Sequence, residues 1–356
     1  MIQYFKNEHG TLYQGDALDV GSRVKPESIQ CCTTSPPYWG QRLYGSSCEI
    51  GLEKTPEEYV EKIVNLGREI RKVLHPSGTF WINIGDTNCV PSTVRETTLG
   101  MKPGVSVKNR IGIPWKVAFA LQEDGWTLRC DIIWYKRNAP RQPVRDRPTY
   151  EHEYIFLFSK KSHYYYDKIA VEQPLKHSNH YAGDRRKIAI ESGGMYKGGH
   201  NIKAELTGRN LSSVWDIPTE PRTDPFHAAF PTKLVELCVK ASTSKEGCCS
   251  KCFTPIKRLI QRKTKASPWK TIGWKKQCKC ENSTIIPCTV LDPFMGRGTT
   301  ALTAEILNKN WVGVELYEDS CKLIKENLIN RKLGLRPLKD VEDGLFQKDE
   351  MDIAIQ

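Results

Sequence analysis

A short motif near the start of this 356-residue chain has residue types suited to holding a planar amine. It consists of Ser35, Pro36, Pro37 and Tyr38. Proline has no backbone N–H, so the Ser35 hydroxyl and the Pro36 carbonyl are left as acceptors for the two hydrogens of an exocyclic amine. Tyr38 can stack on the ring that bears the amine. A proline-rich strand exit with an aromatic side chain on the core would look the same, so the motif alone leaves both interpretations open.

A second motif, near the end of the chain, is a glycine turn that opens an expected helix. Gly296 and Gly298 let the backbone approach a ligand, and the helix start exposes unpaired N–H groups. Neither the full G-x-G-x-x-G pattern nor the Lys-Ser/Thr of a P-loop is present. Asp292 and Glu315 suit a cofactor with cationic groups and free ribose hydroxyls, as in S-adenosylmethionine. Glu315 fits a helix N-cap or a surface charge equally well.

Both motifs need elements that end on the same side of a sheet. Periodicity predicts helices over residues 55–74, 113–125, 231–238, 299–307 and 320–331. Strands are expected over residues 11–16, 28–34, 79–84, 128–135, 153–158, 289–292 and 311–316. This alternation predicts an α/β fold with a seven-stranded, mostly parallel sheet. Such a sheet binds ligands where its strands end, and both motifs follow strands.

Cysteine spacing points to a metal. The chain has thirteen cysteines and no recognisable secretory signal, so a disulfide scaffold is not expected. Two close pairs of cysteines suit a tetrahedral zinc site: Cys249 with Cys252, and Cys278 with Cys280. Free thiols are the alternative. The second pair is tightly spaced, so two other cysteines are candidate replacements, Cys248 and Cys288.

Charge points to a polyanion. The formal net charge is +12, which is typical of a protein with a polyanion partner such as nucleic acid, with solubility alone as an equally open alternative. Between residues 245 and 280 stand eleven lysines and arginines against one acid, Glu246, with Trp269 and Trp274 among them. We expect this stretch to contact DNA phosphates, with a solvated loop as the alternative. The sequence has no apolar run of membrane-spanning length, so we expect a cytoplasmic protein with no membrane partner.

Together the two motifs resemble those of the DNA amino-methyltransferases, which methylate adenine N6 or cytosine N4. That family carries [Ser/Asn/Asp]-Pro-Pro-[Tyr/Phe/Trp] and Asp-Pro-Phe-x-Gly-x-Gly-Thr-Thr, and this chain has the second as residues 292–300. The order, catalytic motif first, is similar to the β group of the family. Residues 227–231 (His-Ala-Ala-Phe-Pro) and 13–16 (Tyr-Gln-Gly-Asp) are similar to two further cofactor segments. The resemblance covers most of residues 10–165 and 212–330.

The resemblance implies a Rossmann-like, S-adenosylmethionine-dependent methyltransferase fold that is circularly permuted, with an inserted target-recognition and zinc segment. It implies that Ser35, Pro36, Pro37 and Tyr38 hold the target base, with Trp39 as a candidate second wall. It also implies the set of residues that bind the cofactor: Asp16, Phe230, Pro231, Asp292, Phe294, Gly296, Gly298, Thr299, Thr300 and Glu315.

The implied activity is methyl transfer to the exocyclic N4 amine of a cytosine flipped out of duplex DNA. Adenine enzymes of the family mostly carry Asp or Asn where this chain has Ser35, so adenine N6 is the alternative. Carbon-5 methylation would need a cysteine nucleophile, and Cys31 and Cys32 lie in an expected buried strand. An RNA or protein-glutamine methyltransferase and a non-catalytic zinc-containing DNA-binding protein are further alternatives. A homodimer and a cognate restriction endonuclease are left open as partners.

The expected organisation has six segments. Residues 1–167 form the catalytic half of the methyltransferase domain, and residues 168–211 form a basic loop or insertion that is a candidate for target recognition. Residues 212–244 return to the core, and residues 245–288 form the Cys-rich, zinc-binding insertion. The cofactor half follows over residues 289–335, and residues 336–356 are a tail.

Overall fold

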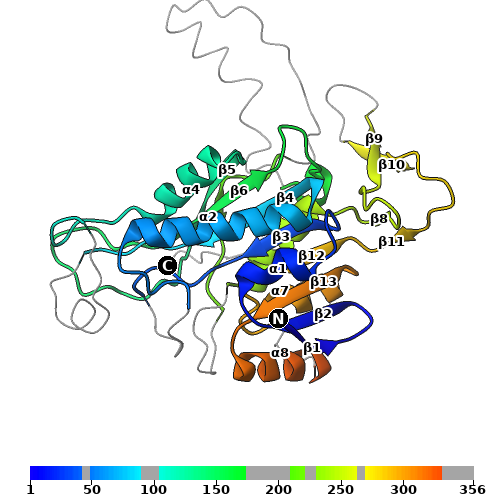
Figure 1. Cartoon of the computed structure of the whole chain (residues 1–356). Coiled ribbons are helices and arrows are strands. Elements are labelled where there is room, and N and C mark those ends of the chain that lie inside the picture. The colour runs from blue at the N-terminus through cyan, green and yellow to red at the C-terminus, as the bar shows by residue number, and fades with distance from the viewer. Residues whose placement is uncertain (42–48, 90–103, 174–208, 221–229, 263–268, 331–356) are drawn as a thin grey trace, which may run out of the picture.

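The computed structural model describes residues 1–41, 49–89, 104–173, 209–220, 230–262 and 269–330 (Figure 1). Its centre is a nine-stranded sheet in the order β1-β2-β13-β12-β3-β4-β6-β5-β7. Helices cover both faces of this sheet, which confirms the expected α/β architecture. Within the described part of the chain, no helix is both long enough and apolar enough to cross a membrane.

Five neighbouring strands in the middle of the sheet run parallel to one another. They are β2 (Gly10–Gln14), β13 (Asn310–Glu315), β12 (Thr289–Asp292), β3 (Ile29–Thr34) and β4 (Leu74–Ile84). Every residue of β3 is buried, as expected for a strand covered on both faces. We call the side where these strands finish the carboxyl end of the sheet, and the opposite side the amino end.

The remaining strands make the sheet mixed. β6 (His152–Ser159) is antiparallel to both β4 and β5 (Thr127–Tyr135), while β7 (Val214–Asp216) is parallel to β5 at one border. At the other border β1 (Ile2–Lys6) is antiparallel to β2. The loop between β5 and β6 therefore lies at the carboxyl end.

The sheet has nine strands, where the sequence predicted seven. The two additional strands, β1 and β7, are border strands: β1 has no buried residue and β7 has three residues. Neither produces the apolar pattern on which the prediction rested. β4 also starts at Leu74, before the expected residue 79, because an irregularity in its pairing with β3 accommodates the His75-Pro76-Ser77-Gly78 segment.

The helices form one layer on each face. One core cluster joins α2 (Pro56–Val73) and α4 (Ile113–Glu123) to Cys32 of β3. The same cluster includes residues of two short helical elements that follow β2, η1 (Ala17–Asp19) and α1 (Val20–Arg23). The other cluster joins α6 (Thr232–Ser242), α7 (Thr299–Ile306) and α8 (Glu318–Asn330) to Cys31. Adjacent residues of β3 thus point into opposite layers.

Helix α2 begins where its sequence predicts. The Thr55 hydroxyl accepts a bond from the Glu58 N–H at 3.2 Å, and the Glu58 carboxylate accepts one from the Thr55 N–H at 3.3 Å. Pro56 occupies the first turn, where its missing N–H leaves no bond unmade. This capping box fixes the helix that packs behind the Ser-Pro-Pro-Tyr motif.

Residues 245–288, which we call the Cys module, form two small sheets beside the main one. β8 (Cys248–Cys249) pairs with β11 (Ile285–Ile286), and β9 (Lys257–Gln261) forms a hairpin with β10 (Lys270–Lys275). The module leads directly into the start of β12, and the Gln30 side chain at the start of β3 donates to the Phe253 carbonyl at 2.9 Å. The Cys module therefore sits at the amino end of the sheet, on the right of Figure 1.

Candidate active site

The two motifs meet at the carboxyl end because β3 and β12 are neighbours. A single buried carboxylate joins them: Asp292, 1% exposed, accepts bonds from the hydroxyls of Thr34 and Thr300, each at 2.6 Å, and from the Phe294 N–H at 3.0 Å. Burial raises the pKa of Asp292 to about 7, against the lowering effect of these donors. Asp292 thus ties the end of β3, the glycine turn and helix α7 together.

The hydroxyl of Tyr38 lies among polar groups from three strands. It donates to the Glu153 carboxylate at 2.8 Å, with the Asn83 side-chain oxygen at 2.9 Å, and Ser35 Oγ lies 3.3 Å from it. The Asn83 amide donates to the Tyr154 carbonyl at 3.1 Å, which fixes its orientation. Burial, and then the charge of Glu153, raise the pKa of Tyr38 well above its usual value, so the phenol stays protonated.

Two contacts hold the backbone and ring of the motif in place. The buried Tyr59 hydroxyl, on α2, donates to the Pro37 carbonyl at 2.9 Å. At Gly85 a Cβ would lie 2.5 Å from Tyr38 Cε2, so only glycine lets the ring lie against this backbone. No residue in the described ranges donates to the Pro36 carbonyl, which leaves this acceptor available.

Trp39 does not form a second wall of this pocket. Its side chain is 3% exposed and lies in the core cluster beneath α2. Its indole N–H donates to the Glu53 carbonyl at 2.9 Å. The burial of Cys31 and Cys32 is as expected: both are fully buried. Desolvation raises the pKa of the Cys31 thiol to about 12 and that of Cys32 well above its usual value, which disfavours the nucleophilic thiolate in both.

The glycine turn has a backbone conformation that favours glycine at two positions. Gly296 and Gly298 have φ of 58° and 89°, in the left-handed region that favours glycine. Among the described residues, the nearest atom to a Cβ built on Gly296 is the Phe294 carbonyl oxygen at 3.9 Å, so the backbone conformation, and not close packing, is what favours glycine here. In the first turn of α7 the buried Thr299 hydroxyl has no hydrogen-bond partner among the described residues.

Glu315, at the end of β13, is hydrogen-bonded to the backbone of the glycine turn. Its carboxylate, 8% exposed, accepts bonds from the N–H groups of Gly296 at 2.8 Å, Leu316 at 3.0 Å and Tyr317 at 3.2 Å. Burial raises the pKa of Glu315 to about 7. Asp16 follows the neighbouring strand β2, and its exposed side chain accepts from the Leu18 N–H at 2.9 Å.

The remaining predicted cofactor residues lie at two helix starts. Phe230 and Pro231 are buried just before α6, and Phe294 is half-buried in the glycine turn. Residues 227–229, which belong to the same predicted segment, lie outside the described residues.

One basic segment at the carboxyl end was missed by the sequence analysis. The loop over residues 136–151 begins at Lys136, which pairs with Glu153 beside Tyr38. Arg141 and Arg145 are exposed and form no ion pair within the described part of the chain. Arg110 and Arg147 lie over the Tyr150 ring, 3.7 and 4.3 Å from its centroid. Five basic residues against two acids between strands were the signal available in the sequence.

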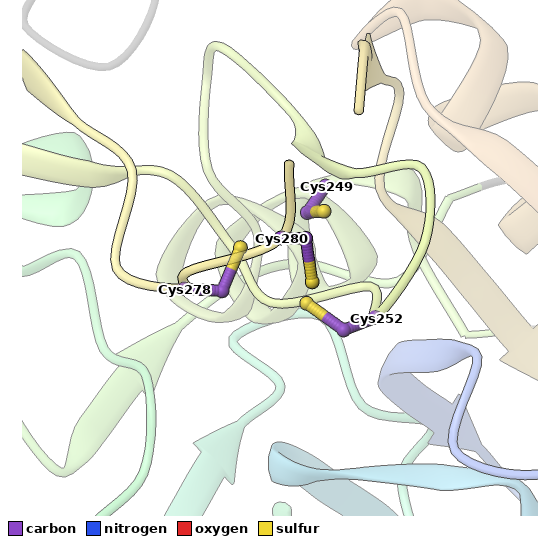
Figure 2. A group of neighbouring side chains, drawn as sticks. All are labelled: Cys249, Cys252, Cys278 and Cys280. Carbon is purple, nitrogen blue, oxygen red and sulfur yellow. The ribbon is translucent and has the colours of Figure 1, made fainter. Parts of the chain in front are cut away.

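The structure brings the four predicted metal-binding cysteines together. The sulfur atoms of Cys249, Cys252, Cys278 and Cys280 all lie within 4.8 Å of one another (Figure 2). The alternatives Cys248 and Cys288 are buried and do not belong to this group. The cluster lies in the Cys module, at the opposite end of the sheet from Tyr38.

A family model for N6/N4 DNA methylases matches residues 29–326. This chain belongs to that family. It is 33% identical over 330 residues to the Type II methyltransferase M.SmaI of Serratia marcescens, covering 89% of this chain and 90% of the relative. It is thus a DNA methyltransferase of the class that modifies cytosine N4 or adenine N6.

Solved structures share its fold. The PvuII DNA methyltransferase, described as cytosine-N4-specific, superposes with a TM-score of 0.58 at 17% identity, over 97% of this chain and 94% of the other. A putative DNA modification methylase from Thermus thermophilus, solved with S-adenosyl-L-methionine, superposes with a TM-score of 0.50 at 20% identity, over 92% of this chain and 97% of the other. Both confirm the methyltransferase fold expected from the motifs.

Tyr38→Phe tests whether the phenol hydroxyl positions the ring. This variant keeps an aromatic face but loses the bond to Glu153, and a hydrogen bond to a charged group is worth about 1.5–3 kcal/mol. We expect kcat for methyl incorporation into DNA to fall roughly tenfold to a hundredfold, with KM for DNA little changed. The control is Tyr166→Phe, because the Tyr166 side chain is 38% exposed and follows β6 at the amino end of the sheet. An unchanged kcat for Tyr38→Phe would show that the hydroxyl has no positioning role.

Proposed function

We propose that this enzyme transfers a methyl group from S-adenosylmethionine to the N4 amine of a cytosine flipped out of duplex DNA. The observation that carries the proposal is the junction of Ser35-Pro36-Pro37-Tyr38 with the glycine turn through Thr34 and Asp292. This bond brings the two motifs side by side where β3 and β12 end, which supports one motif as the amine pocket and the other as the cofactor turn. Adenine N6 is the second candidate, because the same pocket chemistry serves any exocyclic amine.

The residues of the turn fit S-adenosylmethionine. The open space above Gly296 and the unpartnered Thr299 hydroxyl offer contact with the methionine portion. Glu315 would accept from the ribose hydroxyls, Asp16 would accept from the adenine amine, and Phe230 with Pro231 would cover the cofactor. The Thermus thermophilus protein that shares this fold was solved with the same cofactor. When bound, it supplies a methyl group activated by a sulfonium.

The pocket residues would then act on the amine. Its nitrogen lone pair is delocalised into the base, so the amine is a weak nucleophile in its planar state. Ser35 Oγ and the Pro36 carbonyl oxygen would accept the two N–H groups more strongly as positive charge develops on nitrogen, which is preferential binding of the transition state. The Tyr38 ring, held by Glu153 and Gly85, would stack on the base that has left the duplex.

The choice of cytosine rests on Ser35 and is supported by fold similarity. Ser35 stands where adenine enzymes of the family mostly have Asp or Asn, and the PvuII enzyme that shares the fold is described as cytosine-N4-specific. The relatives are described as Type II methyltransferases, which favours a cognate restriction endonuclease as the biological partner. With DNA as its substrate, we place the enzyme in the cytoplasm. Residues 168–211, mostly outside the described ranges, stay our candidate for sequence recognition.

Product analysis decides between the two amines. Mixed genomic DNA is incubated with the enzyme and cofactor labelled in the methyl group, digested to nucleosides and separated against standards. We expect labelled N4-methylcytosine, and we expect no label with Tyr38→Ala, which lacks the stacking ring. N6-methyladenine as the sole product would overturn the cytosine assignment.

We further infer that the loop over residues 136–151 contacts the DNA backbone. It begins and ends beside Tyr38, and it presents Arg141 and Arg145 to solvent. The basic β9–β10 hairpin of the Cys module competes for this role, but it lies at the opposite end of the sheet from the target base. Phosphate contacts made near the flipped base would orient the duplex over the pocket.

The salt dependence of DNA binding separates these two basic segments. In the double variant Arg141→Ala/Arg145→Ala we expect weaker binding and a slope of log K against log salt that is shallower by roughly 2, one for each lost phosphate contact. The matched control is Lys270→Ala/Lys275→Ala in the hairpin, for which we expect the wild-type slope. The reverse pattern would move the DNA path to the Cys module. Affinity is measured by fluorescence anisotropy on one duplex at several salt concentrations.

Cofactor binding should depend on the ionisation of Glu315. Its pKa is raised to about 7, and ribose hydroxyl donors bind the ionised carboxylate better than the protonated one. Binding should therefore tighten as the pH rises through 7, by up to roughly tenfold between about pH 6 and pH 8, with release of a proton. Titration calorimetry in two buffers measures both quantities. Glu315→Gln should bind more weakly and lose this dependence, and a dependence shared by both proteins would exclude Glu315 as its source.

A further inference from the structure

We propose that Cys249, Cys252, Cys278 and Cys280 bind one Zn²⁺ as four thiolates, and that the metal is the structural core of the Cys module. The inference concerns the fold of this chain and does not depend on which base is methylated. The four side chains come from two separate stretches of the chain, and their sulfur atoms gather in one small region (Figure 2).

The distances between the sulfur atoms fit a tetrahedral centre. All four lie within 4.8 Å of one another, and Zn–S bonds of about 2.3 Å in a tetrahedron place sulfurs about 3.8 Å apart. None of the four is in a disulfide. Four protein ligands complete the shell of zinc and leave no open position, as in structural rather than catalytic sites.

The backbone around the first pair is shaped as a compact turn. Phe253, with φ of 59°, donates its N–H to the Cys249 carbonyl at 2.8 Å. The Thr254 hydroxyl lies 3.2 Å from Cys252 Sγ, where it can donate to a thiolate and orient it. These contacts prepare Cys249 and Cys252 as a ligand pair.

The second pair is tied to the first by further bonds. Ser250 N–H donates to the Thr284 carbonyl at 3.0 Å, and Thr284 N–H donates to Ser250 Oγ at 3.1 Å. Lys276 donates to Ser283 Oγ at 2.5 Å and to the Cys280 carbonyl. Four thiolates around Zn²⁺ carry a net charge of about −2, which the lysines interspersed in this segment offset: Lys251, Lys275, Lys276 and Lys279.

The module has too little apolar core to hold its shape without such a centre. β8 and β11 have two residues each, and the β9–β10 hairpin is a separate two-stranded sheet. Ile272 and Ile285 are 60% and 57% exposed rather than packed inside. An isolated two-stranded hairpin is marginal in water, and small units of this kind commonly depend on a metal.

The metal would also hold the amino end of the catalytic sheet. The module is attached there by the Gln30 bond to the Phe253 carbonyl and by Arg258, whose guanidinium contacts the 5%-exposed Asp167 carboxylate at 2.9–3.0 Å. Lys309, just before β13, donates to the carbonyl of Ser244, which directly precedes the module, at 2.6 Å and to that of Lys245 at 3.3 Å. Zinc would thus stabilise the sheet from the end opposite the active site, and its loss would act through unfolding.

Metal analysis of the purified full-length chain tests the proposal. We expect one zinc per chain by plasma mass spectrometry in the wild type and in Cys130→Ser, a half-buried cysteine outside the cluster. Cys278→Ser and Cys280→Ser should lose most of the zinc and unfold at a temperature lower by at least about 5 °C. A wild-type chain without stoichiometric metal, or with iron in place of zinc, would overturn the proposal.

Cobalt substitution keeps the test valid if the serine variants fail to fold. When the wild-type chain is refolded with Co²⁺ in place of zinc, we expect the visible ligand-field absorption and the sulfur-to-cobalt charge transfer of a tetrahedral thiolate site. Added Zn²⁺ should abolish both bands. Cobalt bound without these bands would mean that the four cysteines do not form the site.

Discussion

The architecture of the candidate active site depends on one buried carboxylate. Asp292 accepts hydrogen bonds from the last residue of β3, from the glycine turn and from the first turn of α7. A carboxylate is stable in the core only when hydrogen-bond donors surround it, so the three segments stabilise Asp292 while Asp292 keeps the segments together. These bonds set the distance in space between the Ser-Pro-Pro-Tyr motif and the glycine turn. Ser35 is attached directly to Thr34, and Gly296 lies four residues beyond Asp292.

Local signals in the sequence were sufficient for the elements that build this site. The helical periodicity of α2, the expected buried strand β3 and the strand–turn–helix around Gly296 were enough to predict the fold class and to place both motifs after strands. Asn83 and Glu153 were not predicted, because their strands join them to Tyr38 only through tertiary pairing. For the same reason, no local pattern could reveal that Trp39 packs inward or that Gly85 receives the Tyr38 ring.

The sequence also could not assign basic segments to ends of the sheet. Strand direction alone decides this: β5 ends and β6 begins beside Tyr38, which puts residues 136–151 next to the pocket. The Cys module is richer in charge, yet it precedes β12 and so lies where the strands begin. The Ser-Pro-Pro-Tyr motif therefore lies at the carboxyl end of the sheet, and the four-cysteine cluster lies at the opposite, amino end.

The pairing of β3 with β12 has a consequence for synthesis of the chain. Val290 pairs with Cys31 and Leu291 with Cys32, so strands made near the start and near the end of translation become neighbours in the middle of the sheet. Contacts of such long sequence separation are slow to form, because a long loop must be closed before they are made. The Ser-Pro-Pro-Tyr segment leaves the ribosome early but gains its partner only when the last strands have been made. The order of the motifs thus keeps a nascent chain from possessing a complete pocket.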